Sequence, residues 1–310
     1  MQVLKSKNSV INKAFFCGNG YFYKNYKAMR IIKRKKDIEA FVERNKEMGL
    51  KIGFAPTMGA LHAGHISLYA AARKENDLVI SSIFVNPTQF NNPVDLEKYP
   101  RDVESDLQLL RESGFVDAVY LPEIADLYPE GLATKNYDFG GLENEMEGKF
   151  RPGHFNGVGT VVEELFRQIK PDNAYFGDKD YQQLAIVKKL AAQVNPQISI
   201  HGVGIHREEN GLAMSSRNQR LTADQRAAAK LIFETLNKVN EWFRIITVPE
   251  INRRVKAIFE AEKDMQLEYF EIADEETLQQ TDFFYKDRSY RAFLVVFVGD
   301  VRLIDNLHLD

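Results

Sequence analysis

Two histidines, His62 and His65, stand three residues apart in a segment that follows a short apolar run and precedes a helical pattern. The same segment holds Gly59 and Gly64, which allow a ligand to approach the backbone closely. Exposed N–H groups and the positive end of a helix dipole attract phosphate, and histidines can donate to charge that develops on a phosphoryl group. The segment therefore predicts a nucleotide site. A metal site is disfavoured, because the glutamate of the helical metalloprotease pattern is missing.

Two later segments offer further phosphate donors. Lys179 lies in a turn between a short apolar run and a helical pattern, and Ser215, Ser216 and Arg217 lie just before another helical pattern. Each has an ordinary alternative, because such a lysine is often solvated and a serine before a helix often only caps it. Donor clusters at strand ends of one α/β sheet nevertheless converge on one crevice. Taken together, the segments predict one phosphate-binding cleft.

The elements that must position these donors alternate along the chain. Apolar runs typical of strands cover 51–55, 78–85, 118–121, 174–176 and 198–203, and helical spacing covers 66–74, 102–113, 157–169 and 181–193. Helices of this length between strands imply right-handed crossovers. The pattern predicts an α/β fold with a doubly wound, Rossmann-like parallel sheet.

The pattern of predicted strands and helices changes after about residue 205. Two charged helical stretches, 222–244 and 249–263, precede strand-like runs at 267–273 and 291–298. We therefore expect a basic extension over 1–29, a nucleotide-binding domain over 30–205, and a smaller α+β domain over 206–310 that closes over the site.

Composition excludes several classes of protein. The 310 residues are 44% hydrophobic and 27% charged with a formal charge of −3, which argues against a disordered chain, a fibre or a dedicated polyanion binder. Cys17 is the only cysteine, so neither an intrachain disulfide nor a cysteine-based zinc cluster can form. No run approaches the ~18 apolar residues of a membrane span. These features predict a cytoplasmic protein that does not bind membranes.

The first 30 residues carry a charge of +6 with no acid, while the remaining 280 carry −9. This segment lacks periodicity and precedes a second possible start at Met29, which favours a disordered or non-essential extension whose removal leaves activity unchanged. A nucleic-acid-binding arm and an organellar targeting peptide are the alternatives. The negative charge of the rest of the chain argues against nucleic-acid binding.

Six blocks with intact spacing carry a resemblance to a known family. They are Pro56–Leu68, Ser82–Phe90, Tyr99–Arg101, Arg151–Val158, Phe176–Leu184 and Leu212–Asn218. The chain from about residue 30 to its end resembles the pantothenate synthetase family, the pantoate:β-alanine ligases of the nucleotidyltransferase superfamily. In that family the first block is the "HIGH"-type motif and the last a "KMSKS"-like motif.

The resemblance implies a reaction in two steps. Pantoate and ATP give pantoyl adenylate and pyrophosphate, and the amine of β-alanine then displaces AMP to form pantothenate. Catalysis would fall to His62, His65, Lys179 and Arg217, and pantoate binding to Gln89 and Gln183, with Gln89 also facing β-alanine. The implied ATP contacts are Met58, Gly59, Ala60, Leu61, His62, Ala63, Gly64, His65, Gly177, Asp178, Lys179, Asp180, His206, Met214, Ser215, Ser216 and Arg217. Mg²⁺ would bridge the phosphates with few protein ligands, and no residue is assigned to bind it directly. The family's habit is a homodimer formed through the first domain.

Some roles stay open at this stage. Glu104 or Asp106 stands where relatives often have a run of carboxylates, and Arg151 and His154 either support the site or serve the fold alone. Another adenylyltransferase is an alternative of the same class, which the Gln89 and Gln183 pair disfavours. A nucleic-acid-binding module is the alternative from another class, and it predicts salt-sensitive retention on heparin.

Overall fold

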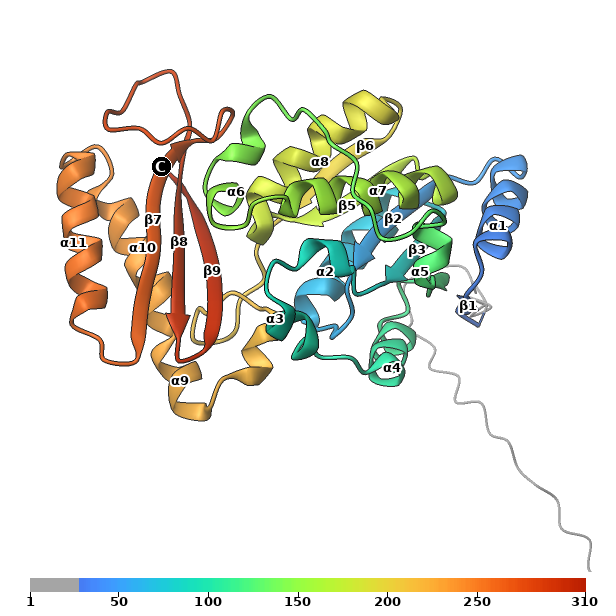
Figure 1. Ribbon diagram of the computed structural model, residues 1–310, viewed down its shortest axis with the longest axis horizontal. Helices are drawn as coiled ribbons and strands as arrows, with labels where there is room; N and C mark the ends of the chain where they lie inside the picture. Colours follow the sequence, from blue (N-terminus) through green and yellow to red (C-terminus); the bar gives the residue numbers. More distant parts are fainter. Residues whose placement is uncertain (1–27) are drawn as a thin grey trace, which may run out of the picture.

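A computed structural model of the chain describes residues 28–310. The predictions made for the basic extension fall almost entirely on residues 1–27, which lie outside the described residues. Residues 28–310 form a larger unit around a parallel sheet and a smaller unit around an antiparallel sheet (Figure 1).

The larger sheet confirms the predicted doubly wound fold. Its strands are β1 (Arg30–Ile32), β2 (Ile52–Thr57), β3 (Leu78–Ile83), β4 (Ala118–Tyr120), β5 (Asn173–Gly177) and β6 (Ser199–Val203). They run parallel in the order β1-β4-β3-β2-β5-β6. The chain winds outward from β2 through β3 to β4 and returns to β5 on the other side of β2. Ligands of such sheets bind at the carboxyl ends of the strands where the winding direction reverses, here between β2 and β5.

Helices cover both faces of this sheet because its strands are apolar on both faces. In β2, Phe54 packs with α1 (Lys35–Glu47), α7 (His154–Ile169) and α8 (Tyr181–Val194), whereas Ala55 packs with α2 (Ala63–Glu75) and α4 (Val103–Ser113). Short helices α3 (Pro93–Glu97), α5 (Ile124–Leu127) and α6 (Glu147–Phe150) lie in the connections. Both core clusters therefore hold the ends of β2 and β5 in place.

The smaller sheet has strands β7 (Met265–Asp274), β8 (Tyr290–Val298) and β9 (Val301–Leu309), paired antiparallel in that order. On one face, Leu294 and Val296 pack against α10 (Lys230–Trp242) and α11 (Val248–Glu260), with α9 (Ala223–Ala228) beside them. On the other face, Phe293 and Val295 join the core of the larger unit. Figure 1 shows this sheet between its own helices and the larger unit.

The structure differs from the sequence predictions in several elements. The stretch 222–244, predicted as one helix, is divided at the buried residue Ala229 into α9 and α10, and the predicted helix over 249–263 ends at Glu260. Strands β1 and β9 and helix α1 were not predicted. In β9, three polar residues interrupt the apolar pattern. Arg302 and Asn306 bond to Glu147 and to the Asp178 carbonyl of the larger unit, and Asp305 pairs with Arg207, just after the expected domain boundary.

Candidate active site

The turn between β2 and α2 forms the first wall of the site. Gly59 and Ala60 have positive φ angles of 85° and 51°, which reverse the chain before the helix begins. A Cβ atom at residue 59 would lie 2.9 Å from the carboxylate of Asp106, so this close approach requires glycine. His62 then caps α2, and its Nδ1 accepts the N–H of Gly64 at 3.2 Å.

Both imidazole rings are held in one tautomer. Nδ1 of His62 accepts from Gly64, and Nδ1 of His65 accepts the N–H of His62 at 3.2 Å. An accepting Nδ1 carries no proton, so each neutral ring has its proton on Nε2. The ring centroids are 4.1 Å apart, and both residues line one cavity. The turn therefore leaves two Nε2–H donors for a ligand.

Burial is the main cause that lowers the pKa of both rings. It lowers the pKa of His62 to about 4, with further repulsion from Lys179, and it lowers the pKa of His65 well below the usual value, with repulsion from His62 and Lys179. Both rings are therefore neutral near pH 7. A phosphate ligand would therefore meet neutral imidazole donors, not imidazolium cations.

The free energy of unfolding is expected to fall as the pH is lowered from 6.5 towards 4. The unfolded histidines take up protons near pH 6.5, whereas His62 and the buried His154 stay neutral in the fold until about pH 4. Above 6.5 both states are neutral and the effect is absent. Urea unfolding between pH 7.5 and 5 measures this dependence. The variant His62→Asn, which retains a helix cap, should unfold with about one proton less taken up, and an unchanged slope would contradict the assignment.

Asp106 holds the turn between β2 and α2 through its backbone. Its carboxylate accepts the N–H groups of Ala60 at 3.0 Å and Leu61 at 2.6 Å, while Oγ of Ser216 donates to the carbonyl of Ala60 at 3.0 Å. Asp106 is only 4% exposed, whereas Glu104 lies on the exposed side of α4. Of the two acids left open by the sequence, Asp106 is therefore the one that positions the turn.

Replacing Asp106 by asparagine should lower the free energy of unfolding by about 2 kcal/mol, the scale for leaving one buried donor without a partner. The amide has one oxygen for two N–H groups, and its own N–H₂ faces one of them. Chemical unfolding measures the loss. Asp102→Asn is the matched control, because Asp102 caps the same helix from an exposed position. Equal stability of the two variants would contradict this role.

The second wall carries Lys179. Strand β5 ends at Gly177, the 3₁₀ turn η3 (Asp178–Asp180) follows, and α8 begins at Tyr181. The Lys179 side chain is 19% exposed and lines the cavity, and its Nζ is 4.0 Å from the carboxylate of Asp180. This separation is too long for a hydrogen bond, so the ammonium keeps its capacity to bind an anion.

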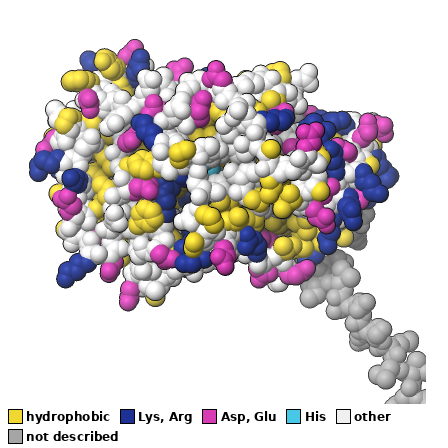
Figure 2. All heavy atoms as spheres, in the orientation of Figure 1, with side chains coloured by type: hydrophobic (Ala, Val, Ile, Leu, Met, Phe, Trp, Pro, Cys, Tyr) yellow, Lys and Arg dark blue, Asp and Glu magenta, His cyan; other side chains and the backbone are white. Residues whose placement is uncertain are grey.

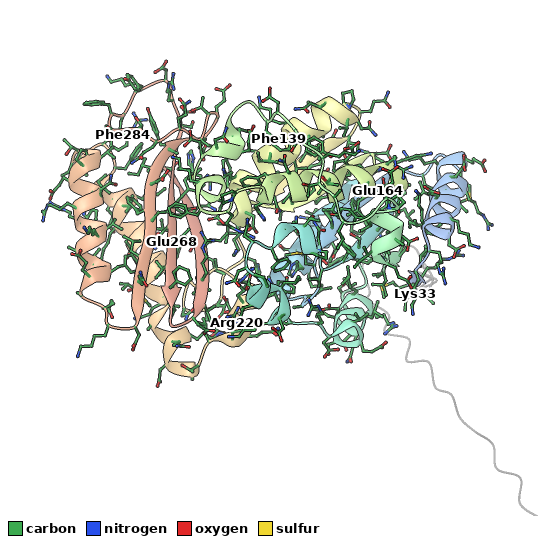
Figure 3. The ribbon with its side chains drawn as sticks, in the orientation of Figure 1. Lys33, Phe139, Glu164, Arg220, Glu268 and Phe284 are labelled. Carbon is green, nitrogen blue, oxygen red and sulfur yellow. The ribbon has the colours of Figure 1, made fainter. Side chains whose placement is uncertain are left out.

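The third wall is formed by residues 214–217, which lead into the 3₁₀ turn η4 (Ser216–Arg220). Arg217 donates to Asp95 of α3 at 2.7 Å and lies 5.7 Å from the ring centre of Tyr99. Burial opposes the charge of Arg217, but the ion pair with Asp95 raises its pKa. Arg220 bonds to Asp95 at 3.2 Å and to Asp300 at 3.1 Å, and it lies where the two units meet (Figure 3).

The two glutamines line the same cavity and come from different elements. Gln89 ends the 3₁₀ turn η1 (Pro87–Gln89), and Gln183 lies in the first turn of α8. The backbone carbonyl of Gln89 accepts from the Arg151 guanidinium at 2.9 Å and from Nδ1 of His154 at 2.9 Å. Arg151 and His154 therefore hold the segment that presents Gln89, which supports their reading as residues that serve the site.

These walls enclose a cavity of about 230 Å³. A small area of histidine surface shows between larger side chains near the middle of the molecule in Figure 2. Most of the predicted residues line the cavity: Met58, His62, Gly64, His65, Gln89, Gly177, Lys179, Asp180, Gln183, His206, Met214, Ser215, Ser216 and Arg217. Gly59, Ala60, Leu61, Ala63 and Asp178 are not among the lining residues. The substrate contacts of all the predicted residues stay predictions.

Several lining residues were not predicted as site residues. Asn86, Phe84 and Tyr99 lie in the blocks of the family resemblance, which was the signal that could have identified them. Part of the apolar lining comes from α7, namely Val158, Val161, Val162 and Leu165. Their helical spacing alone does not separate them from the rest of the core.

The described residues show neither a metal-binding cluster nor a helix that could span a membrane. Within 28–310, no group of three or more His, Cys, Asp or Glu side chains is arranged to hold a metal ion. Within the same range, no helix combines the length and apolar character that crossing a membrane requires.

Comparison with known proteins gives one consistent result. The family model for pantoate-β-alanine ligase matches residues 30–308. The pantothenate synthetase of Flavobacterium psychrophilum is 47% identical over 281 residues, which are 91% of this chain and 100% of the relative. The crystal structure of pantothenate synthetase from Thermus thermophilus matches with a TM-score of 0.82 at 38% identity, covering 90% of this chain and 99% of that one.

A further solved structure shows a relative with ligands. The pantoate-β-alanine ligase of Francisella tularensis, complexed with β-γ ATP and β-alanine, matches with a TM-score of 0.75 at 38% identity, covering 91% of this chain and 98% of that one. The family model, the sequence relatives and the solved structures all give the same family. This chain belongs to the pantoate-β-alanine ligase family.

Proposed function

We propose that this chain condenses pantoate with β-alanine at the expense of ATP, through a pantoyl adenylate, and releases AMP and pyrophosphate. The observation that carries the proposal is the convergence of two neutral imidazole donors, Lys179 and Arg217 on one cavity that also presents two amides. Membership of the family and the ligands of the Francisella relative support it.

In the first step, a carboxylate oxygen of pantoate attacks the α-phosphorus, and the bond to the β-phosphate breaks. This reaction needs positioning and stabilisation of charge more than a covalent catalyst. The Nε2–H groups of His62 and His65 would donate to phosphate oxygens, and Lys179 and Arg217 would hold the charge that passes to pyrophosphate. Arg217 bonds to Asp95 in the structure, so phosphate would share or replace that partner.

Gln89 and Gln183 would recognise pantoate. Each amide supplies both a donor and an acceptor, which suits a substrate with hydroxyl groups and a carboxylate. In the second step, the β-alanine amine attacks the acyl carbon, the bond to the AMP oxygen breaks, and the nitrogen loses a proton. Gln89 would face this second substrate as well.

We propose that Mg²⁺ enters the site bound to ATP and is not held permanently by the protein. The donor set fits this role, because Asp180 is the one carboxylate among the described residues that line the cavity. Asp180 and the phosphates would hold the ion, which would offset negative charge on the phosphate oxygens.

We also propose a homodimer formed through the first domain, a cytoplasmic location, and a domain boundary at residues 205–206 with the second domain closing over the site. These proposals rest on the family resemblance and the composition. Sedimentation of the purified chain tests the homodimer directly.

Mass spectrometry after incubation with ATP, Mg²⁺, pantoate and β-alanine tests the proposed function. The expected products are pantothenate and AMP in equal amounts, and no pantothenate is expected when pantoate or β-alanine is omitted. If the chain were instead an adenylyltransferase for a different substrate, it would form an adenylate with another acid. A nucleic-acid-binding protein would be retained on heparin in a salt-sensitive way, without turnover.

A further inference from the structure

A side chain of the smaller sheet bonds directly to the turn that carries Lys179. Asn306 of β9 is 2% exposed and faces the larger unit. Its Nδ2 donates to the carbonyl oxygens of Asp178 and Lys179, both at 2.9 Å. These carbonyls belong to η3, so one amide from the second unit is hydrogen-bonded to the backbone of the candidate catalytic lysine.

The orientation of this amide is chemically fixed. Arg291 of β8 donates to Oδ1 of Asn306 at 2.6 Å, and a guanidinium can only donate, so the oxygen must face it. Arg291 is itself held by Glu275 at 2.8 Å and lies 4.1 Å from the ring centre of Tyr181. Both N–H groups of the amide are therefore directed at η3.

The grip on the backbone matters because the Lys179 head group has no close partner among the described residues. Its nearest carboxylate, that of Asp180, is 4.0 Å away. The position of the ammonium therefore depends on its backbone and on packing. Phosphate positioning is sensitive to this, since a shift of about 1 Å at a catalytic group can cost 10²-fold in rate.

We propose that Asn306 is a positioning residue that places Lys179 for adenylate formation, so that the smaller sheet builds part of the active site as well as covering it. This inference rests on the proposed function for its catalytic consequence. Its structural part, the placement of Lys179, is independent of turnover.

The variant Asn306→Asp separates the two contacts of this side chain. Aspartate keeps an acceptor for Arg291 but replaces the N–H donors by an oxygen that faces two carbonyls. We expect the rate of adenylate formation to fall by about 10- to 100-fold, with kcat affected far more than the KM for ATP. Leu303→Ala is the matched control, because Leu303 is buried on the other face of β9 and its loss weakens the sheet without touching η3.

A double-variant cycle shows whether the effect passes through the lysine. In a Lys179→Ala background, Asn306→Asp should have little further effect on adenylate formation, because the group that it positions is absent. A full additional loss there, or an equal loss in Leu303→Ala, would overturn the inference.

Chemical labelling gives a readout that does not depend on turnover. The acetylation rate of Lys179, followed by peptide mass spectrometry, should change in Asn306→Asp and stay unchanged in Leu303→Ala. An unchanged rate in Asn306→Asp would overturn the inference even if the parent chain forms no adenylate. A parent chain without adenylate formation would refute the proposed function alone.

Discussion

Replacing Lys179 by alanine should lower the rate of adenylate formation by at least about 10³-fold, the upper part of the range for removing one preorganised donor from a charged transition state. Lys179 and Arg217 are the two cationic side chains among the described residues that line the cavity, and Arg217 is already paired with Asp95. The loss therefore removes the cation that is more available to phosphate. Single-turnover release of pyrophosphate measures the effect.

Two further variants sharpen this result. Lys189→Ala removes an exposed lysine from the outer face of α8, close in sequence to the site, and should leave the rate unchanged. Lys179→Arg keeps the charge in a different shape and should recover part of the lost rate. A Lys179→Ala variant that formed adenylate at the parent rate would show that the lysine is a solvated residue of the turn.

His65→Ala should slow adenylate formation by roughly 10²- to 10³-fold while the fold is retained. The structure allows a finer division, because the two nitrogens of His65 have different partners. Nδ1 accepts the N–H of His62, which leaves the Nε2–H group as the donor for a ligand in the cavity that His65 lines. Asparagine places an oxygen near the Nδ1 position, and glutamine places an N–H₂ group near the Nε2 position.

We therefore expect His65→Asn to be as slow as His65→Ala but more stable to urea, and His65→Gln to be the fastest of the three. Rates from pyrophosphate release and stabilities from urea unfolding check the two expectations separately. Equal rates for the asparagine and glutamine variants would contradict donation from Nε2. A parent-like rate in His65→Ala would make the turn a structural element only.

The sequence predicted the larger sheet well because its signals are local. Apolar runs such as the one before Pro56 are followed by glycines and then by a helical pattern. Buried parallel strands produce such continuous apolar runs, so the strands of this sheet are easy to recognise in the sequence. The chemistry also follows from local order, since the carboxyl ends of β2 and β5 must lie side by side once the sheet is doubly wound. Hence His62 and Lys179 could be predicted to share a cleft, and the family resemblance added the two glutamines to it.

The contacts that hold these residues could not be predicted in the same way, because their partners are far apart in the chain. Asp106 lies 46 positions from Ala60, Asp95 lies 122 from Arg217, and Asn306 lies 127 from Lys179. A single sequence contains no signal that pairs such residues. The missed strand β9 has the same cause, since its polar residues become intelligible only when the partners across the two units are known.

Isotope exchange between labelled pyrophosphate and ATP tests the adenylate mechanism most directly. Donors for the triphosphate, together with the amides of Gln89 and Gln183 for the hydroxy acid, predict that the first step is complete without the amine. Pantoate alone should therefore support exchange, and β-alanine alone should support none. A strict need for β-alanine, or formation of ADP in place of AMP, would contradict the account and indicate a ligase that works through an acyl phosphate.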